Sequence, residues 1–221
     1  MENEFRAMLP MDVSVHTARI RLRKVVVAEL MKMKKEIKDE AMKLADANVD
    51  VIGFGCTTGS LVAGHGYDER IVEVIEKATR RPAIATAGAV VQALRALGLS
   101  RVSVATPYTE DLNRLECQFL EQNGFSVDRI AGLSLVDNLR IADVKPRTLL
   151  GLVGKVDSKR ADGIFISCTN LPTIGVIARL EDTLKKPVVS SNTATLWAML
   201  RKVGERLQTD NYGKLFLQSQ G

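Results

Sequence analysis

Two cysteines in similar local sequences are the residues of this chain best suited to chemistry. Cys56 lies in the segment VDVIGFGCTTGSL at residues 49–61, and Cys168 lies in GIFISCTNLP at residues 163–172, about half the chain later. In each segment a short apolar run precedes the cysteine, as is typical of a buried strand, and helix-like sequence follows it. We therefore expect both thiols at the carboxyl ends of strands, where open α/β sheets bind ligands.

A helix that starts after each cysteine would give the thiol a reactive environment. The N-terminus of a helix carries unpaired N–H groups and a positive partial charge, which stabilise a thiolate and lower a cysteine pKa below its usual value of about 8.5. The same groups would bind a carboxylate. Polar side chains that could add donors follow each cysteine, namely Thr57, Thr58, Thr169 and Asn170. The alternative is that Cys56 and Cys168 are simply buried small apolar residues. This alternative is less favoured because the two cysteines lie in matching local sequences.

Composition excludes several other classes of protein. The 221 residues are 46% hydrophobic, enough for one substantial domain or two small lobes. Three scattered cysteines give neither a disulfide framework nor a zinc pattern, so we expect no metal and a cytoplasmic protein. The N-terminal residues do not resemble a signal peptide, and there is no apolar run of about 18 residues, so we expect no membrane contact.

The net charge of +5 does not by itself indicate a nucleic-acid partner. Basic residues are spread along amphipathic stretches rather than clustered with aromatics, and aromatics make up 5% of the chain. A solvated helix face accounts for them, so we expect no nucleic acid.

The chain alternates strand-like and helix-like segments. Strands are expected at residues 13–22, 82–86, 101–106, 125–135 and 187–190, besides the two that carry cysteines. Helices are expected at residues 4–9, 27–47, 88–97, 109–124, 146–159, 173–184 and 192–203, together with one through residues 71–75. A loop is expected to begin at Asp137, and Asn192 or Thr193 is expected to cap the last helix. Such alternation favours parallel sheets covered on both faces, and two such units facing each other would place two thiols across one cleft.

The ordered set of motifs resembles a known family. The motifs are GCTTGS at residues 55–60, GHGYD at 64–68, ATPYT at 105–109, Asp137-Asn138, SCTNL at 167–171 and SSN at 190–192. They are similar to the aspartate/glutamate racemase superfamily, in particular its maleate cis-trans isomerase and arylmalonate decarboxylase branch. The resemblance covers nearly the whole chain and implies two pseudo-symmetric flavodoxin-like lobes with the active site between them. We expect residues 1–95 and 192–221 in the first lobe and residues 96–191 in the second.

The resemblance also implies a mechanism without a cofactor. A thiolate at Cys56 would add to one alkene carbon of a small cis-dicarboxylate such as maleate, giving a succinyl-thioether carbanion in which the former double bond can rotate. Expulsion of the cysteine yields the trans acid, with Cys168 as the opposing acid and base. Tyr108 and Asn138 would hydrogen-bond a substrate carboxylate. From the residues alone, Tyr108 could equally be a strand-end aromatic and Asn138 a turn residue.

Three alternatives remain open at this point. A racemase of acidic amino acids would use the same thiol pair as two bases, and an arylmalonate-type decarboxylase would be expected to keep only the second cysteine. From another class, the chain could be an inactive small-ligand binding module. In each case we expect a homo-oligomer.

One part of the family pattern is missing. The family opens with a central strand and a Ser-Asn-Thr loop, whereas residues 1–5 resemble the segment after that loop. We therefore expect the first strand of the N-terminal lobe to be absent, which would leave its neighbours with unpaired edges. We expect either that the natural start lies upstream or that another segment fills the gap.

Overall fold

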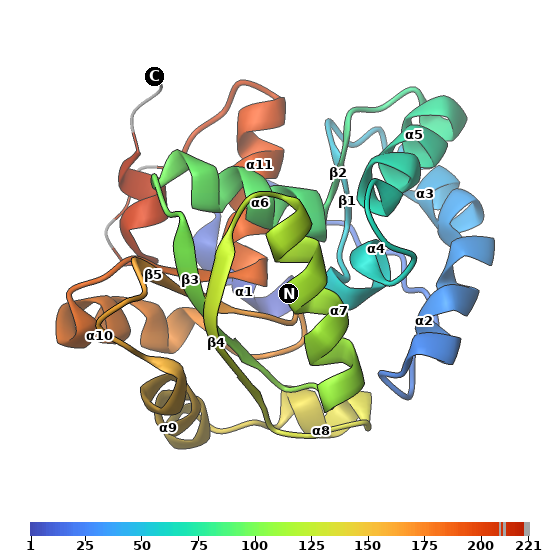
Figure 1. Cartoon of the computed structure of the whole chain (residues 1–221). Helices are drawn as coiled ribbons and strands as arrows, with labels where there is room; N and C mark the ends of the chain where they lie inside the picture. The colour runs from blue at the N-terminus through green and yellow to red at the C-terminus, as the bar shows by residue number, and fades with distance from the viewer. Residues whose placement is uncertain (208, 210, 219–221) are drawn as a thin grey trace.

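The computed structural model describes residues 1–207, 209 and 211–218, and it contains two parallel β-sheets (Figure 1). The small sheet pairs β1 (Ile52–Phe54) with β2 (Ala83–Ala85). The large sheet has the order β4-β3-β5-β6. Its strands are β3 (Arg101–Thr106), β4 (Ser126–Gly132), β5 (Gly163–Ile166) and β6 (Val188–Ser190). Every strand pairing in both sheets is parallel, which confirms the predicted α/β class.

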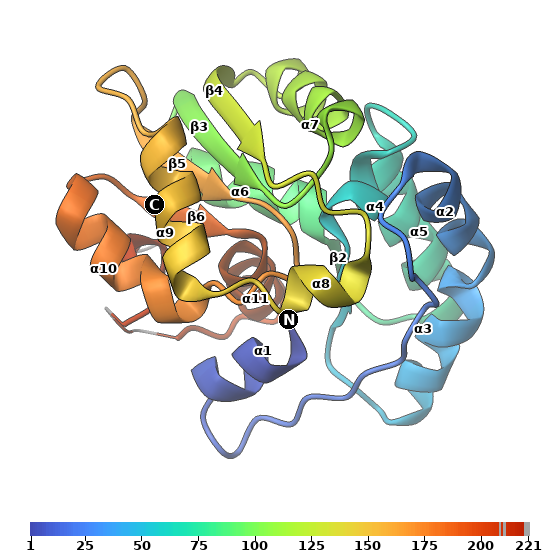
Figure 2. The same ribbon diagram turned by 90° about the horizontal axis from the view of Figure 1, so that it is seen from below.

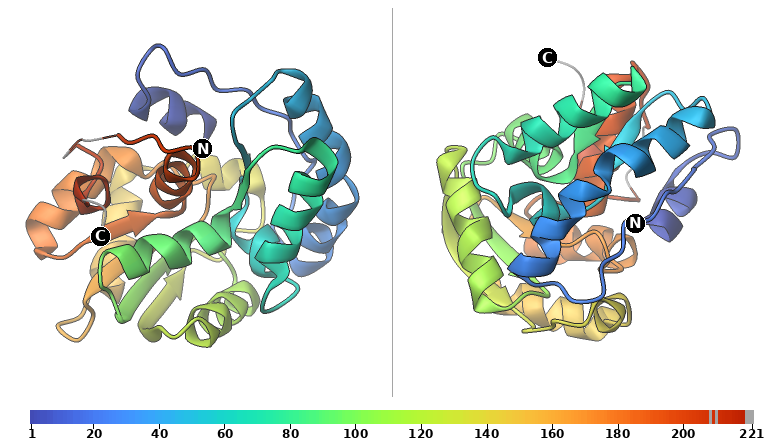
Figure 3. Two further views of the ribbon diagram at one scale, coloured as in Figure 1. Left: turned by 90° about the horizontal axis from the view of Figure 1, so that it is seen from above. Right: turned by 90° about the vertical axis from the view of Figure 1, so that its right-hand side faces the viewer.

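The helices connect the strands and cover both faces of the large sheet. They are α1 (Glu2–Met8), α2 (Val27–Lys32), the 3-10 helix η1 (Met33–Lys35), α3 (Ile37–Asp46), α4 (Thr57–Leu61), α5 (Tyr67–Thr79), α6 (Thr86–Ala96), α7 (Glu110–Gln122), α8 (Asn138–Ala142), α9 (Pro146–Val156), α10 (Ile174–Leu184), α11 (Ser191–Lys202) and the 3-10 helix η2 (Lys214–Leu217). Helices α9 and α10 lie on one face, whereas α6 and α11 pack together on the other, between the two sheets (Figure 3).

Strand β5 illustrates why the sequence forms a parallel sheet. Its residues Ile164, Phe165 and Ile166 are all almost completely buried. The two isoleucines contact the apolar cluster under α9 and α10, while Phe165 contacts the cluster under α6 and α11. A continuous apolar run is what a strand covered on both faces requires.

The predicted strand at residues 13–22 is wrong. The segment runs from α1 toward α2 in extended form, along the lower edge of the view in Figure 2. Residues 14–22 make no backbone–backbone hydrogen bond to any residue that the structure describes. The alternation of side chains predicted a strand, but a strand needs a neighbour with which to form a ladder.

Three smaller predictions also need correction. The helix predicted at residues 27–47 is divided into α2, η1 and α3. The loop predicted from Asp137 is the start of α8, because the Asp137 carboxylate accepts hydrogen bonds from the N–H groups of Leu139 and Arg140. The N-cap of α11 is Ser190, whose hydroxyl forms a capping box with Thr193.

The two sheets share a local pattern but differ in size. Strand β1 precedes Cys56 and β2 leads into α6, just as β5 precedes Cys168 and β6 leads into α11. In the large sheet β5 lies between β3 and β6. In the small sheet β1 pairs with β2 on one side, and on its other side, where β3 stands in the large sheet, no strand lies within the described residues. The small sheet therefore has two strands, and the proposed explanations for a missing strand stay predictions.

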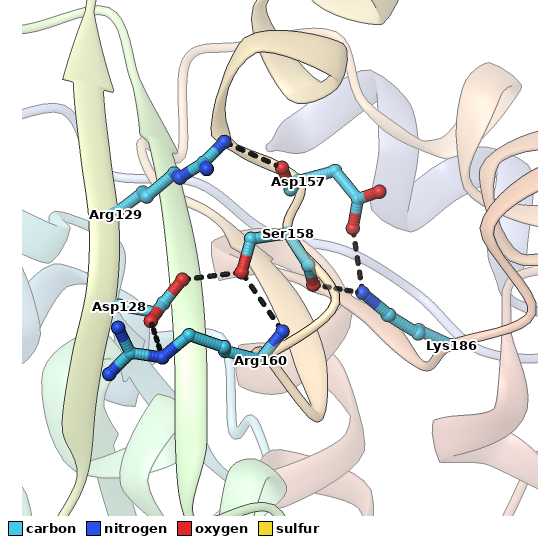
Figure 4. A network of polar contacts seen from close by, with 6 residues as sticks. All are labelled: Asp128, Arg129, Asp157, Ser158, Arg160 and Lys186. Carbon is cyan, nitrogen blue, oxygen red and sulfur yellow. Dashed lines mark hydrogen bonds and ion pairs between the residues drawn. The ribbon is translucent and has the colours of Figure 1, made fainter.

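A polar network holds the large sheet together at the end away from the cysteines (Figure 4). The Ser158 hydroxyl donates to Asp128 on β4 at 2.5 Å, and Lys186, just before β6, donates to Asp157 at 2.9 Å. The loop before β5 is thereby tied to both of these strands. Since its ion pairs are partly exposed, we expect each to contribute little to stability.

Candidate active site

Cys56 occupies the N-cap position of the short helix α4. Its sulfur accepts a hydrogen bond from the N–H of Gly59 at 3.3 Å. The glycine is needed for this close approach, since a Cβ at residue 59 would lie 2.8 Å from the sulfur. The sequence Cys-Thr-Thr-Gly thus folds the backbone around the thiol, as predicted from its position after an apolar strand.

Cys168 is held differently from Cys56. It follows β5, but α10 begins only at Ile174, so the prediction of a helix N-terminus directly after this cysteine is wrong. Its φ angle is +99°, in a region that non-glycine residues rarely adopt. The N–H of Cys168 donates to the Ser191 hydroxyl at 3.0 Å, and its sulfur accepts from the N–H of Asn170 at 3.4 Å. Strained backbone of this kind is concentrated at functional sites.

The two cysteine segments contact each other through hydroxyl groups. Thr57 donates to Ser191 at 2.8 Å, and Ser191 also accepts from the N–H of Cys168. Thr169 donates to the carbonyl of Gly55 at 3.0 Å. Residues that are more than 100 positions apart in the sequence are thereby fixed at one place.

Cys56 and Cys168 both line one cavity of about 1270 Å³. The cavity is lined by all eight predicted site residues: Cys56, Thr57, Thr58, Tyr108, Asn138, Cys168, Thr169 and Asn170. It also extends along β1 to Ile75 and Met199, which makes it much larger than a four-carbon acid requires.

The predicted lowering of the thiol pKa values is not found. Burial raises the pKa of Cys56 to about 12, although the Gly59 N–H and the Thr58 hydroxyl act in the opposite direction. Burial also raises the pKa of Cys168, against the N–H of Asn170 and the hydroxyl of Tyr108. Desolvation outweighs hydrogen bonding because both thiols lie in the interior, and α4, with five residues, is too short to have a large dipole.

The predicted binding residues differ in the groups that they leave available. Burial raises the pKa of Tyr108 well above its usual value, so its hydroxyl stays a donor. The hydroxyls of Thr57 and Thr169 are already donated within the protein. The Asn170 amide donates to the side chain and carbonyl of Asn138, so these two residues form a pair at the cavity wall.

Sequence reasoning missed the role of the segment at the start of α11. Ser191 is completely buried and accepts hydrogen bonds from both cysteine segments. The motif at residues 190–192 is part of the family pattern, but no spacing rule relates a serine there to cysteines 23 and 135 positions earlier.

The N-terminal residues also reach the site. The amino group of Met1 donates to the Thr169 carbonyl at 2.7 Å, and desolvation lowers its pKa. The buried carboxylate of Glu4 accepts hydrogen bonds from Thr173, from the N–H of Ile174 at 2.8 Å and from the Asn192 amide at 2.5 Å. Helix α1 is thereby attached to the segment after Cys168.

Two features are not found in the part of the chain that the structure describes. Among the described residues, no group of three or more His, Cys, Asp or Glu side chains is placed to hold a metal ion. None of the helices in that part of the chain has the length and apolar character needed to cross a bilayer.

Comparison with known proteins identifies the class to which this fold and site belong. A model of the arylmalonate decarboxylase family matches residues 4–216. The chain therefore belongs to that family and is an enzyme, primarily an isomerase.

Individual relatives agree with this assignment. The maleate isomerase of Pseudomonas putida KT2440 is 32% identical over 91% of this chain and 86% of its own length. The arylmalonate decarboxylase of Bordetella bronchiseptica is 30% identical over 84% of this chain and 78% of its own length. Among solved structures, the chain is similar to the maleate isomerase Iso from Pseudomonas putida S16, solved with maleate in a variant with one cysteine replaced by alanine. The two chains are 31% identical and superpose with a TM-score of 0.92, over 99% of this chain and 92% of that chain.

Proposed function

We propose that the enzyme catalyses the cis–trans isomerisation of a small dicarboxylate, maleate, without a cofactor. The observation that carries the proposal is that Cys56 and Cys168, from distant segments, line one cavity. The similarity to maleate isomerases over most of the chain supports the same substrate class.

In this proposal Cys56 is the nucleophile and Cys168 the acid and base. The Cys56 thiolate forms a C–S bond to one alkene carbon, and the Cys168 thiol protonates the neighbouring carbon where negative charge develops. The resulting succinyl thioether has a C–C single bond, about which it rotates. Cys168 then removes a proton from the same carbon, the C–S bond breaks, and the trans acid leaves with both sulfurs in their starting states.

The pair must carry one negative charge at the start of this cycle. Because burial raises the pKa of both thiols, one proton has to leave the pair before Cys56 can attack. The Gly59 N–H and the Thr58 hydroxyl favour the charged form of Cys56, so they are the groups that would stabilise the thiolate. We therefore expect activity to increase as the pH rises above neutrality.

The substrate carboxylates require donors near the two sulfurs. The N–H groups of Thr57 and Thr58 lie in the first turn of α4 and make no hydrogen bond to the described residues. Tyr108 lines the same cavity, and its hydroxyl keeps its proton. We propose that these groups bind one carboxylate, and that the Asn138–Asn170 pair and the backbone after Cys168 bind the other.

Proton NMR of the enzyme with maleate in heavy water tests the proposal. We expect fumarate to form, and we expect Cys56→Ser and Cys168→Ser to reduce its rate by a factor of about 1,000 or more, as is usual for loss of a covalent catalyst. Phenylmalonate, aspartate and glutamate are the comparison substrates. Release of CO2 or exchange of the α-proton, with no fumarate formed from maleate, would contradict the proposal.

Decarboxylation of an arylmalonate is the second candidate, since the family model and the Bordetella relative both carry that name. Cys168 would then protonate the carbanion that remains after CO2 leaves. The presence of Cys56 favours isomerisation.

Several finer features remain proposals. These are the division into lobes at residues 1–95 with 192–221 and 96–191, the homo-oligomeric state, the cytoplasmic location and the lack of a nucleic-acid partner.

A further inference from the structure

The Glu116 side chain is a buried carboxyl group to which the proposed chemistry assigns no role. It lies on α7 and is 1% exposed. Its Oε1 atom accepts a hydrogen bond from the Ser167 hydroxyl at 2.5 Å. Its Oε2 atom is also buried and has no hydrogen-bond partner among the described residues. A carboxyl group in such a place is costly, because burial without a charged partner disfavours its ionised form.

Ser167 connects this carboxyl group directly to a reactive thiol. It is the residue before Cys168, and its N–H donates to the Ala105 carbonyl at 2.8 Å, so it continues the pairing of β5 with β3. The backbone then turns sharply at Cys168. Glu116 therefore fixes the residue before the strained cysteine, while Ser191 fixes the N–H of the cysteine itself.

The charge of Glu116 also acts on the site. Ionised Glu116 raises the pKa of both Cys168 and Tyr108. Burial raises the pKa of Glu116 itself to about 8, so the carboxyl is mostly neutral at pH 7 and gains its charge in mildly alkaline solution. The titratable groups that act electrostatically on Cys168 are Glu116 from α7, Tyr108 from the loop before α7, Cys56 from the start of α4, and the amino group of Met1.

We propose that Glu116 is a positioning residue for Cys168: through Ser167 it holds the turn that carries the thiol, and when ionised it keeps that thiol protonated. This inference rests on the proposed role of Cys168 as the acid. Near neutral pH the carboxyl is an uncharged hydrogen-bond acceptor. As the pH rises, its negative charge opposes loss of the Cys168 proton, so the acid stays available while Cys56 becomes a better nucleophile.

Titration of the Cys168 thiol alone tests the electrostatic part. In a Cys56→Ser, Cys117→Ala background, Cys168 is the only cysteine, and its ionisation is followed by the ultraviolet absorbance of the thiolate. Glu116→Gln keeps the shape and an acceptor for Ser167 but cannot ionise. We expect it to lower the titration midpoint by about one pH unit, a common effect of one neighbouring charge.

The control is Glu121→Gln, which makes the same charge change at an exposed position on the same helix and should leave the midpoint unchanged. Equal midpoints in the background, the Glu116→Gln variant and the control would overturn the proposal. This readout needs no catalysis. If the shift is found and the wild-type enzyme makes no fumarate from maleate, the proposed isomerisation is refuted and the link between Glu116 and Cys168 stands.

The positioning part is tested in the otherwise wild-type enzyme. Ser167→Ala removes the hydrogen bond but leaves the carboxyl group, and we expect it to lower kcat for maleate about tenfold with little change in KM, because the turn rather than the carboxylate contacts is altered. Near-ultraviolet circular dichroism confirms that the variant is folded. A folded Ser167→Ala enzyme with wild-type kcat would refute the positioning role.

Discussion

The hydroxyl of Ser191 joins the two cysteine segments, and its removal should weaken the whole site. It accepts hydrogen bonds from Thr57 at 2.8 Å and from the N–H of Cys168 at 3.0 Å, and the residue is 0% exposed. Ser191→Ala would leave both donors buried without an acceptor. The substitution removes one atom and keeps the Cβ, so the cavity that it creates is small.

The expected cost follows from the two orphaned donors. A buried donor without a partner costs about 1–3 kcal/mol, so two of them should reduce the free energy of unfolding by about 2–6 kcal/mol. Typical domains are stable by about 5–15 kcal/mol, so a loss of this size removes a large part of the stability. Because the N–H of Cys168 loses its anchor at a strained φ angle, we also expect isomerase turnover to fall at temperatures where the variant is folded.

Urea unfolding followed by circular dichroism measures this difference. The matched control is Ser126→Ala on β4, where the serine is exposed and its hydroxyl makes no hydrogen bond to the described residues. We expect the control to change stability by less than about 0.5 kcal/mol. If Ser191→Ala changes the free energy of unfolding as little as the control does and keeps normal turnover, this hydroxyl does not hold the site.

Three further predictions follow from burial and charge. Burial raises the pKa of Cys56 to about 12 and that of Cys117 to about 11. Alkylation of both thiols by iodoacetamide should therefore be slow at pH 7, and its rate should rise about tenfold per pH unit. The rates are measured by peptide mass spectrometry, and rates that do not change with pH would contradict this prediction. The raised pKa of Glu116, about 8 in the folded chain, means that stability should fall as the pH rises from about 4.5 to about 8, by up to about 1.4 kcal/mol per unit. Urea titrations should show this slope reduced in Glu116→Gln, and an unchanged slope would refute it. Glu4→Ala leaves several buried donors without an acceptor and should lower the free energy of unfolding by about 3 kcal/mol or more. The control Glu2→Ala removes one exposed ion pair and should lower it by less than about 1 kcal/mol. Equal effects of the two substitutions in thermal unfolding would argue against the role of Glu4.

The raised thiol pKa values affect how the enzyme should be assayed. A reactive cysteine is often sought by its fast alkylation at neutral pH. Here both Cys56 and Cys168 are buried, and desolvation keeps them protonated at rest. Slow labelling at pH 7 would thus agree with the proposed chemistry, and protection by a dicarboxylate at alkaline pH is the more informative measurement.

Local sequence determined the class of fold and indicated the candidate site residues. The continuous apolar run of β5 predicted a strand buried on both faces, and the span of β3 agrees with residues 101–106 as expected. These features depend on neighbours along the chain. The same holds for the close approach of the backbone to the Cys56 sulfur, which Gly59, three residues later, allows. The eight candidate residues were found from motifs, and the fold places all of them at one cavity.

Only the tertiary structure decided features that depend on partners far along the chain. The alternating residues 13–22 do not form a strand, because pairing requires a neighbour and the described residues supply none. The thiol pKa values follow from desolvation, which no local motif encodes. The link from Glu116 through Ser167 to Cys168 and the shared hydroxyl of Ser191 join segments that only packing brings within hydrogen-bond distance.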